Sequence, residues 1–289
     1  MVTTSSPTAW RRWLALELRR LRENSGLAQK EASNRCGFSG ARLSYLENAQ
    51  QNVVESDLDK LLPLYGVPGD DRDRYYEAVR NSRERGWWQR FEPLIPDWLA
   101  LYIGLEQGAA EIRSFLPLVL PGLLQTPKYA AAVITGDVRR RSQREIARLV
   151  ELRTTRQRIL TRSEDPTRLW AVMDEGVLTR TPEDPHAMIA QLQHLIDIAA
   201  YPNITLQVLP RLRGVHSYTP GPFNILIFPW DQPDPNLVYI EYRGGAVYLD
   251  EFEDIESHTL AFTGLVEQAL SQDDSIAMMR NEIERYRDP

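Results

Sequence analysis

The stretch Gln29–Glu47 constrains the fold of this chain more than any other segment. Its sequence, QKEASNRCGFSGARLSYLE, places a small residue, a glycine and then aliphatic residues at fixed intervals. Ser33 is small enough for two crossing helices to approach each other, and Gly37 can adopt the positive φ that a tight turn requires. Leu43 and Leu46 then fall on one face of the following helix. The spacing predicts two short helices joined by a tight turn.

This helix-turn-helix arrangement indicates duplex DNA as a partner, because the second helix of such a unit can lie in the major groove with its N-terminal residues at base edges. Ser39 is placed to cap that helix. By analogy with this class of motif, the expected DNA contacts lie before, within and just after the second helix. They are Gln29, Ser39, Gly40, Ala41, Arg42, Ser44, Tyr45, Asn48 and Gln50.

Within this set, Gly40, Ala41 and Tyr45 are expected in the groove, and Arg42 and Ser44 at its walls. Tyr45 can offer its hydroxyl to a base or its ring to a thymine methyl group, but it lacks the bidentate fork of Arg or Gln. Most of the directional contact is therefore assigned to Arg42. The alternative interpretation of Arg42 is a solvated charge on a helix.

The remaining expected contacts do not read bases. Gln29 is expected at a phosphate, at the N-terminus of the first motif helix. Asn48 and Gln50 follow the second helix, where amides can hold phosphates and fix the register. An ordinary polar loop is the equal alternative for these two residues.

The distribution of charge agrees with a DNA-binding segment near the N-terminus. The 289-residue chain has a formal net charge of −6, which by itself suits a phosphate-binding protein poorly. Residues 1–48, however, hold eight Arg or Lys and four Glu, a net charge of +4, so the rest of the chain carries −10. Glu47 is expected to pair with an arginine of the first helix, such as Arg19 or Arg20, because a carboxylate that faced phosphates would repel them.

Length and composition indicate a globular protein of about two domains, since 43% of its residues are apolar. No run of about 18 apolar residues could span a bilayer, and the N-terminal residues MVTTSSPTAW lack the order of a secretion signal, so a cytoplasmic protein is expected. Cys36 is the only cysteine, so no internal disulfide can form, and its position suits a buried residue. No cofactor and no metal are expected.

Apolar periodicity predicts an all-α domain over residues 1–85. The stretch Trp10–Asn24 has the pattern of an amphipathic helix. A further helix is predicted over Ser56–Tyr65, which Gly66 and Pro68 end, and a charged helix follows over about Asp70–Arg85. Together with the two motif helices, these segments make a five-helix domain.

Residues 86–289 predict a mixed α/β domain with a small sheet, so the whole chain is α+β. The domain begins with an aromatic segment, Trp87–Trp98, and the two prolines of Phe115–Leu124 favour an extended or turning segment there. Helices are predicted at Lys128–Ile134, Gln143–Arg162, Pro185–Ala200, Ile255–Leu270 and about Asp274–Tyr286. Strands are predicted at Leu169–Met173, Ile204–Leu209, Phe223–Phe228, Leu237–Glu241 and Ala246–Leu249. The last three favour a hairpin or meander, with Gly244-Gly245 at a turn.

In its motifs the chain resembles the Xre-type, lambda-repressor-like DNA-binding regulators, in the actinobacterial branch that includes WhiJ-like proteins. The resemblance rests on LRRLRENSGLAQKEASNRCGFSGARLSYLENAQ in the first half and on GWWQRF, LPGLLQTPKYA, ELRTTRQRIL, MDEGVL, ITLQVLP, GPFNILIF, VYIEY and QALSQDDS in the second. It implies a lambda-repressor-like N-terminal domain. The chain departs from the usual motif at Ala28, where Thr or Ser normally caps the first motif helix, so capping falls to Ser25 or is absent.

The resemblance also implies a protein partner, because such regulators are typically encoded beside a small BldB-like protein, in pairs described as resembling toxin and antitoxin systems. From the residues themselves, Trp87 and Trp88 and the loop that contains His216 and Tyr218 are the candidates for a partner or ligand surface. For the tryptophans, plain core packing is the favoured alternative. The loop around His216 is the better candidate.

No catalytic or metal-binding pattern is found in the sequence. Its four histidines are scattered without HExxH spacing, and the acidic pair Asp174-Glu175 and the run Asp250–Asp254 lack an accompanying nucleophile. The motifs GxSxG and GxGxxG and a phosphate-binding loop are absent. The second domain is therefore interpreted as a dimerising and sensing module, and not as an enzyme.

The sequence thus predicts a sequence-specific transcription regulator that binds a double-stranded DNA operator as a homodimer. Its C-terminal domain is expected to bind a small partner protein or an effector that modulates operator binding. Two alternatives stay open. One is an antitoxin-like protein that sequesters a small BldB-like partner and only autoregulates, and the other is a repressor gated by a small molecule.

Overall fold

A computed structural model describes residues 6–39, 41–137, 141–180, 184–213, 221–230 and 234–288. The predicted site residues Gly40, His216 and Tyr218 lie outside the described residues. The chain divides into two compact units. Unit 1 comprises Met1–Gln89, Leu101–Ala109 and Phe228–Pro235, and unit 2 comprises Arg90–Ala100, Ala110–Ile227 and Asn236–Pro289.

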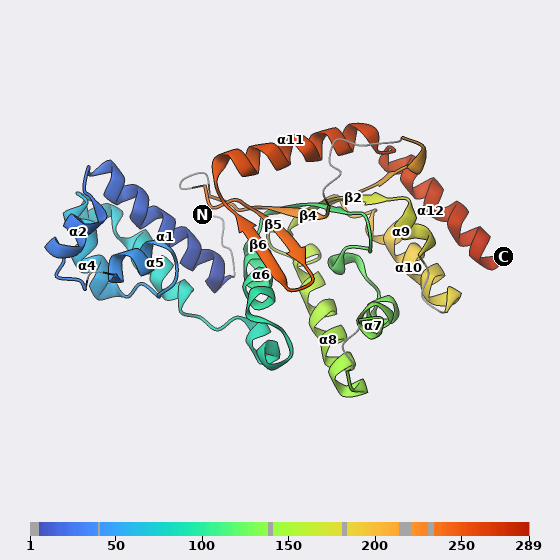
Figure 1. The fold of residues 1–289 in the computed structure, drawn as a ribbon, viewed down its shortest axis with the longest axis horizontal. Coiled ribbons are helices and arrows are strands. Elements are labelled where there is room, and N and C mark those ends of the chain that lie inside the picture. The colour runs from blue at the N-terminus through green and yellow to red at the C-terminus, as the bar shows by residue number, and fades with distance from the viewer. Residues whose placement is uncertain are drawn as a thin grey trace. The chain divides into compact units, whose positions relative to one another are not determined.

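Unit 1 contains the helices that the periodicity of the N-terminal sequence predicts (Figure 1). They are α1 (Pro7–Asn24), α2 (Gln29–Arg35), α3 (Arg42–Glu47), α4 (Glu55–Leu64) and α5 (Asp73–Ser82). A 3-10 turn over Gly69–Asp71 precedes α5, so the charged helix is shorter at both ends than the predicted Asp70–Arg85. Gly66 follows α4 with a φ of 74°, which confirms where that helix ends.

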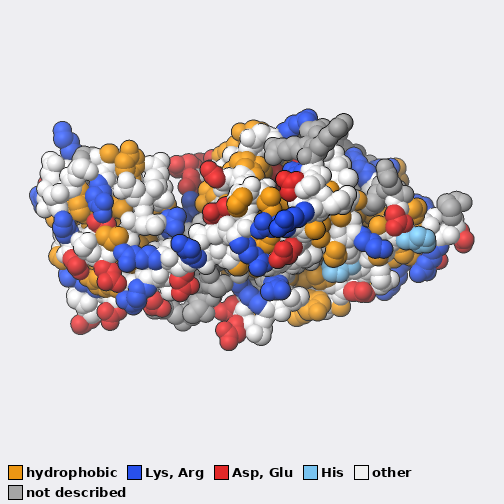
Figure 2. Space-filling view, turned by 90° about the horizontal axis from the view of Figure 1, so that it is seen from below, with side chains coloured by type: hydrophobic (Ala, Val, Ile, Leu, Met, Phe, Trp, Pro, Cys, Tyr) orange, Lys and Arg blue, Asp and Glu red, His pale blue; other side chains and the backbone are white. Residues whose placement is uncertain are grey.

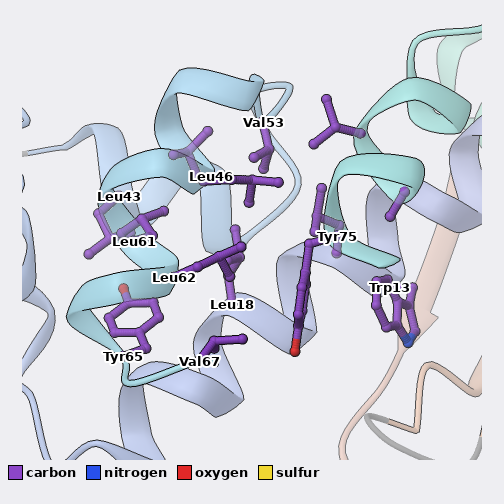
Figure 3. Packing of buried hydrophobic residues seen from close by; sticks show 14 of the residues in the cluster. Trp13, Leu18, Leu43, Leu46, Val53, Leu61, Leu62, Tyr65, Val67 and Tyr75 are labelled. Carbon is purple, nitrogen blue, oxygen red and sulfur yellow. The ribbon is translucent and has the colours of Figure 1, made fainter. Parts of the chain in front are cut away.

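The apolar faces of these helices meet in one core (Figure 3). Leu43 and Leu46 of α3 are fully buried against Leu61 and Leu62 of α4, and Leu18 of α1 joins them. Cys36 also lies in this core, and burial raises the pKa of its thiol. Burial of this apolar surface is what fixes α3 on the unit, because a helix of six residues has little stability by itself.

Two segments from later in the chain complete unit 1. The ring of Trp230 lies 5.0 Å from that of Trp10 and 6.1 Å from that of Trp13, and it stacks on Phe228. The guanidinium Nε of Arg12 donates a hydrogen bond of 2.9 Å to the carbonyl of Pro235. The apolar end of α1 is therefore covered by residues that follow the fourth strand of the chain.

Unit 2 is built on a six-stranded mixed sheet with the strand order β3-β2-β1-β4-β5-β6. The strands β1, β2 and β3 are parallel, whereas β4, β5 and β6 form an antiparallel meander next to β1. The strands are β1 (Glu111–Leu116), β2 (Arg168–Asp174), β3 (Ile204–Leu209), β4 (Phe223–Ile227), β5 (Leu237–Tyr242) and β6 (Gly245–Leu249). All five predicted strands and the predicted meander are confirmed.

The helices of unit 2 lie on both faces of the sheet (Figure 1). One face packs on α11 through a cluster that includes Phe115, Phe223 and Phe262, and α7 and α8 lie on the opposite side. The helices are α7 (Pro127–Thr135), α8 (Gln143–Arg156), α9 (Gly176–Thr179), α10 (Pro185–Ile198), α11 (Phe252–Gln268) and α12 (Gln272–Arg287). Among the described residues, no helix has the length and apolar character needed to cross a membrane.

Several elements differ from the sequence-based expectation. The helix predicted over Gln143–Arg162 ends at Arg156 and is followed by a 3-10 segment over Gln157–Leu160, and the short helix α9 was not predicted. The helix α6 (Asp97–Gly108) and a 3-10 segment over Trp87–Leu94 replace the irregular aromatic segment. The strand β1 lies earlier than the expected extended segment, since Pro117 follows its last residue and the chain then turns into a short 3-10 helix over Gly122–Leu124. The charged residues Glu111 and Arg113 interrupt the apolar pattern by which a strand is found in the sequence. In the structure they form an ion pair, with 2.6 Å between the Nε of Arg113 and the Oε1 of Glu111.

Candidate nucleic-acid interface

The turn between α2 and α3 has the geometry that its residues predict. Gly37 adopts a φ of 65°, and the next N–H, that of Phe38, donates a hydrogen bond of 2.9 Å to the carbonyl of Ser33. Ser33 is 2% exposed, and its hydroxyl points to the carbonyl of Ser39 at 3.4 Å. A small residue at position 33 and a glycine at position 37 thus allow the two helices to cross closely.

The predicted capping of α3 by Ser39 is wrong. The helix begins at Arg42, and Ala41 is its N-cap without a side-chain hydrogen bond. The backbone carbonyl of Ser39 accepts the N–H of Arg42 at 2.9 Å, so the hydroxyl lies too early in the chain to reach the first turn. Side-chain capping of α2 is absent as well, and Ser25 instead ends α1 by donating its hydroxyl to the carbonyl of Arg22.

The outward face of α3 is open to solvent. Ala41 is exposed, and the side chain of Tyr45 is 42% exposed, whereas Leu43 and Leu46 are fully buried. Ala41 and Tyr45 are four residues apart and so share one face of the helix. This face is backed by the buried Leu43 and Leu46, and an α-helix is an element that the major groove of DNA admits.

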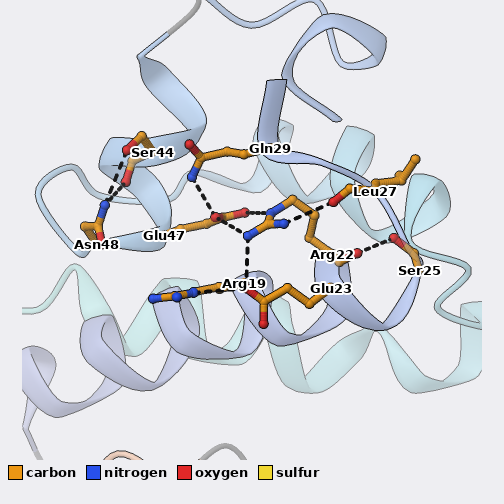
Figure 4. A network of polar contacts seen from close by, with 9 residues as sticks. All are labelled: Arg19, Arg22, Glu23, Ser25, Leu27, Gln29, Ser44, Glu47 and Asn48. Carbon is orange, nitrogen blue, oxygen red and sulfur yellow. Dashed lines mark hydrogen bonds and ion pairs between the residues drawn. The ribbon is translucent and has the colours of Figure 1, made fainter. Parts of the chain in front are cut away.

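Asn48, which follows α3, is hydrogen-bonded to Ser44 of that helix. The side-chain amide of Asn48 donates to the carbonyl of Ser44 at 2.8 Å and approaches its hydroxyl at 3.3 Å (Figure 4). Asn48 and Gln50 are both exposed, whereas Ser44 is half-buried. These residues lie together at the end of α3, as a backbone-contacting group requires.

Arg42 has a second role that the sequence did not predict. Its Nη2 donates to both carboxylate oxygens of Asp57, at 2.8 and 2.9 Å, and Asp57 also accepts the N–H of Val54 at the start of α4. The ion pair therefore ties α3 to α4. About a third of the Arg42 side chain stays exposed, and its contact with DNA stays a prediction.

Phe38 and Lys60 are functional candidates that the sequence analysis missed. The guanidinium carbon of Arg42 lies 5.5 Å from the centre of the Phe38 ring, and the ammonium of Lys60 lies 5.2 Å from it. The ring thus holds two cations beside the turn through cation–π attraction. Lys60 belongs to α4, so no spacing within the motif could have linked it to Phe38.

A buried ion-pair network fixes α3 against α1 (Figure 4). Glu47 accepts the Nε of Arg22 at 2.7 Å and its Nη2 at 3.1 Å, and both residues are buried. The Nη1 of Arg22 donates to the carbonyl of Leu27 at 3.0 Å. The hydrogen bonds to Glu47 raise the pKa of Arg22, so its guanidinium group stays charged, and the donors of that group are satisfied.

The expectation that Glu47 pairs with an arginine of the first helix is confirmed, but that arginine is Arg22 and not one of the examples Arg19 and Arg20. Arg19 bonds to Glu23 and Arg20 to Glu17, both within α1. Arg22 follows the buried Leu18 by four residues, and so it lies on the inward face of α1, where it reaches Glu47. The expected structural role of Glu47 is confirmed.

Gln29 belongs to the same network. Its Nε2 donates to the second carboxylate oxygen of Glu47 at 2.9 Å, which holds the first turn of α2 near the end of α3 (Figure 4). The predicted contact of Gln29 with a phosphate stays a prediction. A phosphate would bind the amide only in competition with a buried carboxylate or beside it.

The end of α3 is strained at one position. Ala49 has a φ of 55°, and the next N–H, that of Gln50, bonds to the carbonyl of Tyr45 at 2.9 Å. Gly37 and Gly66 occupy the equivalent left-handed position after α2 and α4. Alanine carries a Cβ that disfavours this conformation, and glycine does not.

Replacing Ala49 with glycine is expected to raise the free energy of unfolding by about 1 kcal/mol, because the left-handed conformation is then unstrained. Urea denaturation of the full chain measures the change. The matched control is Ala147→Gly at an exposed position within α8, which should lower it by about 1 kcal/mol. A loss of stability in both variants would contradict the assignment of strain to Ala49.

Trp87 and Trp88, the two described candidates for a partner surface, pack largely against other residues of unit 1. Trp88 is 5% exposed, and its ring lies next to Gly86 and Gly104. Trp87 is half-buried, donates its Nε1 to the side chain of Gln107 at 3.2 Å, and meets Trp88 edge to face. This arrangement favours core packing for both, as the alternative interpretation had it.

The acidic pair of unit 2 binds backbone groups. Asp174 accepts the N–H of Gly176 at 2.7 Å, and Glu175 accepts that of Arg211 at 2.9 Å. Among the described residues, no group of three or more His, Cys, Asp or Glu side chains is arranged to hold a metal ion. Both carboxylates therefore help to shape the turn after β2.

Two family models match different parts of the chain. Residues 13–75 match the model of a helix-turn-helix domain, so the chain is a helix-turn-helix protein with a DNA-binding domain. Residues 99–281 match the model described as a domain of unknown function (DUF5753). No curated protein and no solved structure matches the chain. The second match covers more than half of the sequence, and the chain therefore belongs to the DUF5753 family.

Proposed function

We propose that this protein is a sequence-specific transcription regulator that binds its operator as a homodimer and inserts α3 of each copy into the major groove. The observation that carries the proposal is the exposed face of Ala41 and Tyr45 on a helix whose other side is buried in the core. An exposed helix of this kind, entered from a tight turn, is the reading element of helix-turn-helix proteins.

The surroundings of α3 support the electrostatic part of the proposal. Arg42 and Lys60 flank the ring of Phe38 beside the turn, and Lys30 is exposed on α2. Cations at the ends of a recognition helix neutralise phosphates and release counterions, which provides affinity without sequence preference. Operator affinity is therefore expected to fall steeply as the salt concentration rises.

In this proposal two copies of α3 lie about 34 Å apart on a palindromic site, one turn of DNA from each other. The DUF5753 part binds a small BldB-like partner or an effector that modulates operator binding. The resemblance carried by strings such as LPGLLQTPKYA and GPFNILIF supports this second part. We assign the protein a regulatory role and no catalytic one.

The decisive experiment begins with selection of duplexes from a random pool by the full chain. One palindromic sequence is expected to be enriched. Tyr45→Ala should then weaken binding of that duplex by about 10-fold at fixed salt, because a side chain in the groove is lost. The unfolding midpoint should stay unchanged, since the Tyr45 side chain is exposed.

The matched control is Tyr201→Ala, which removes a tyrosine of similar exposure, 47%, from unit 2. This variant should bind the duplex as the unmodified protein does. Failure to enrich any sequence, or equal binding by both variants and the parent, would refute the assignment of α3 as the reading helix.

A further inference from the structure

The two edges of the sheet in unit 2 differ in how they are covered. At one edge, the N–H of Val208 in β3 donates to the hydroxyl of Ser275 at 2.9 Å, and its carbonyl accepts the N–H of Leu270 at 2.9 Å. Residues at the start of α12 and just before it therefore satisfy outer backbone groups of β3. The other edge is β6, and within the described ranges no strand pairs with its outer side (Figure 1). An open edge strand is a template for a strand of another chain.

The backbone of β6 offers hydrogen-bonding groups to such a strand. Tyr242 pairs with Gly245, so a two-residue turn joins β5 to β6. The pair that closes a hairpin of this length exchanges hydrogen bonds, and the pairs after it alternate between bonded and non-bonded positions. Gly245 and Val247 thus bond to β5, whereas the N–H and the carbonyl of Ala246 point to the outer side of the edge.

The side chains of β6 are self-complementary in one antiparallel register. With Val247 of one copy opposite Val247 of a second copy, Gly245 lies opposite Leu249. In the same register Ala246 lies opposite Tyr248. Each pair beside the centre therefore joins a small side chain and a large one, which lets the two backbones approach without a clash.

Charge complementarity favours the same register. The extended backbone continues beyond β6 to Glu251, which has a φ of −75° and a ψ of 145° and precedes α11. When Val247 is at the centre, Glu251 of one copy reaches the end of the strand at which Arg243 of the other copy forms the hairpin turn. Both side chains are exposed, and two-fold symmetry repeats the pair at the other end. Opposite charges across neighbouring strands stabilise their pairing, and like charges oppose it.

Exposed apolar side chains are concentrated around this edge. Of the nine large apolar side chains that are exposed in the described part of the chain, three lie within residues 242–252: Tyr242 at 57%, Val247 at 42% and Phe252 at 70%. On the side of unit 2 that Figure 2 shows, hydrophobic side chains are dispersed among Lys, Arg, Asp and Glu side chains. Exposed apolar surface bordered by charges is typical of protein–protein interfaces.

We propose that two copies of this chain pair through β6, antiparallel and with Val247 on the two-fold axis, so that their sheets continue into each other. The occupant of the open edge is thus a second copy, because the small-to-large and the acid-to-base pairs both match when the strand meets itself. This inference rests on the homodimer of the proposed function and assigns its surface, and its test needs no DNA.

Cross-linking of the full chain tests the register. Cys36 is the only cysteine, and it is buried. Val247→Cys places two thiols in a non-hydrogen-bonded pair, where the Cα atoms are about 4.5 Å apart and a disulfide can form. Oxidised glutathione should therefore convert most of this variant to a disulfide-linked dimer. The matched control is Ala246→Cys, whose thiols would be diagonal neighbours about 7–8 Å apart and should cross-link about 10-fold more slowly.

Exchange of charges tests the pairing without a new covalent bond. Arg243→Glu should raise the dissociation constant of the dimer by about 10-fold in analytical ultracentrifugation, because like charges then meet at both ends of the paired strands. Glu251→Arg should have the same effect. The double variant should return to within about 3-fold of the parent, since opposite charges meet again. Damage to the fold by either substitution would not be repaired by the other.

The results separate this inference from the operator proposal. A dimer that cross-links equally at positions 246 and 247, or that forms equally well in both single charge variants, would show that another surface joins the copies, with the operator proposal untouched. A chain that stays monomeric would remove both the β6 interface and the homodimer. Selective cross-linking at position 247 without enrichment of any duplex would uphold the interface and refute the operator proposal.

Discussion

Replacing Arg22 with methionine is expected to lower the free energy of unfolding of unit 1 by about 3–5 kcal/mol. The reason is the carboxylate that remains. Glu47 is 3% exposed, and without Arg22 it would keep only the amide of Gln29 as a hydrogen-bond donor among the described side chains. A buried charge without a counter-ion costs far more than the ion pair itself contributes.

Urea denaturation measures this loss, and hydrogen exchange of the α1 and α3 amides locates it. The matched control is Arg19→Met, which breaks an exposed pair with Glu23 on the same helix, with both side chains about half exposed. That variant should change stability by less than about 1 kcal/mol. Equal effects of the two substitutions would show that the Arg22–Glu47 pair does not hold α3.

The second large effect is expected at Gln191 of α10, which is fully buried. Its Nε2 donates to the carbonyl of Leu124, and its Oε1 accepts the N–H of Thr126, each at 2.7 Å. The side-chain amide thus satisfies one backbone carbonyl and one backbone N–H, as a neighbouring strand would, and it holds the segment that joins β1 to α7. Gln191→Leu leaves both backbone groups buried and unsatisfied, which should cost about 2–5 kcal/mol.

The loss is measured by urea denaturation, with hydrogen exchange of residues 120–130 as the local readout. Gln193→Leu is the matched control on the same helix, since Gln193 is exposed and its side-chain amide donates a hydrogen bond to Asp197 at 2.9 Å. It should change stability by no more than about 0.5 kcal/mol. If Gln191→Leu were equally mild, the segment would be held by its apolar contacts alone.

Local patterns in the sequence were sufficient to predict the elements that depend on nearby residues. The spacing of Ser33, Gly37, Leu43 and Leu46 predicted the helix-turn-helix unit, because the crossing, the turn and the buried face all arise within 14 residues. The strands of unit 2 were found because branched and aromatic residues alternate with turn signals. Side-chain partners from distant segments were not predictable in this way.

The candidate site illustrates this limit. Arg42 was expected to face DNA, and its ion pair with Asp57 depends on how α4 returns across α3. Arg22 was overlooked as the partner of Glu47 because several arginines follow one another on α1 and only the packed helix selects the inward one. Gln191 and Gln125 resemble ordinary surface residues in the sequence, and only the fold buries them.

The packing of Trp230 on Trp10 and Trp13 of α1 has a consequence for how this protein can be divided into fragments. Trp230 and Pro235 belong to the connection between β4 and β5, yet they complete unit 1. A DNA-binding fragment cut after the fifth helix would lack this cover and expose Trp10. The same connection joins β4 and β5 of unit 2 covalently to the residues that cover α1 of unit 1.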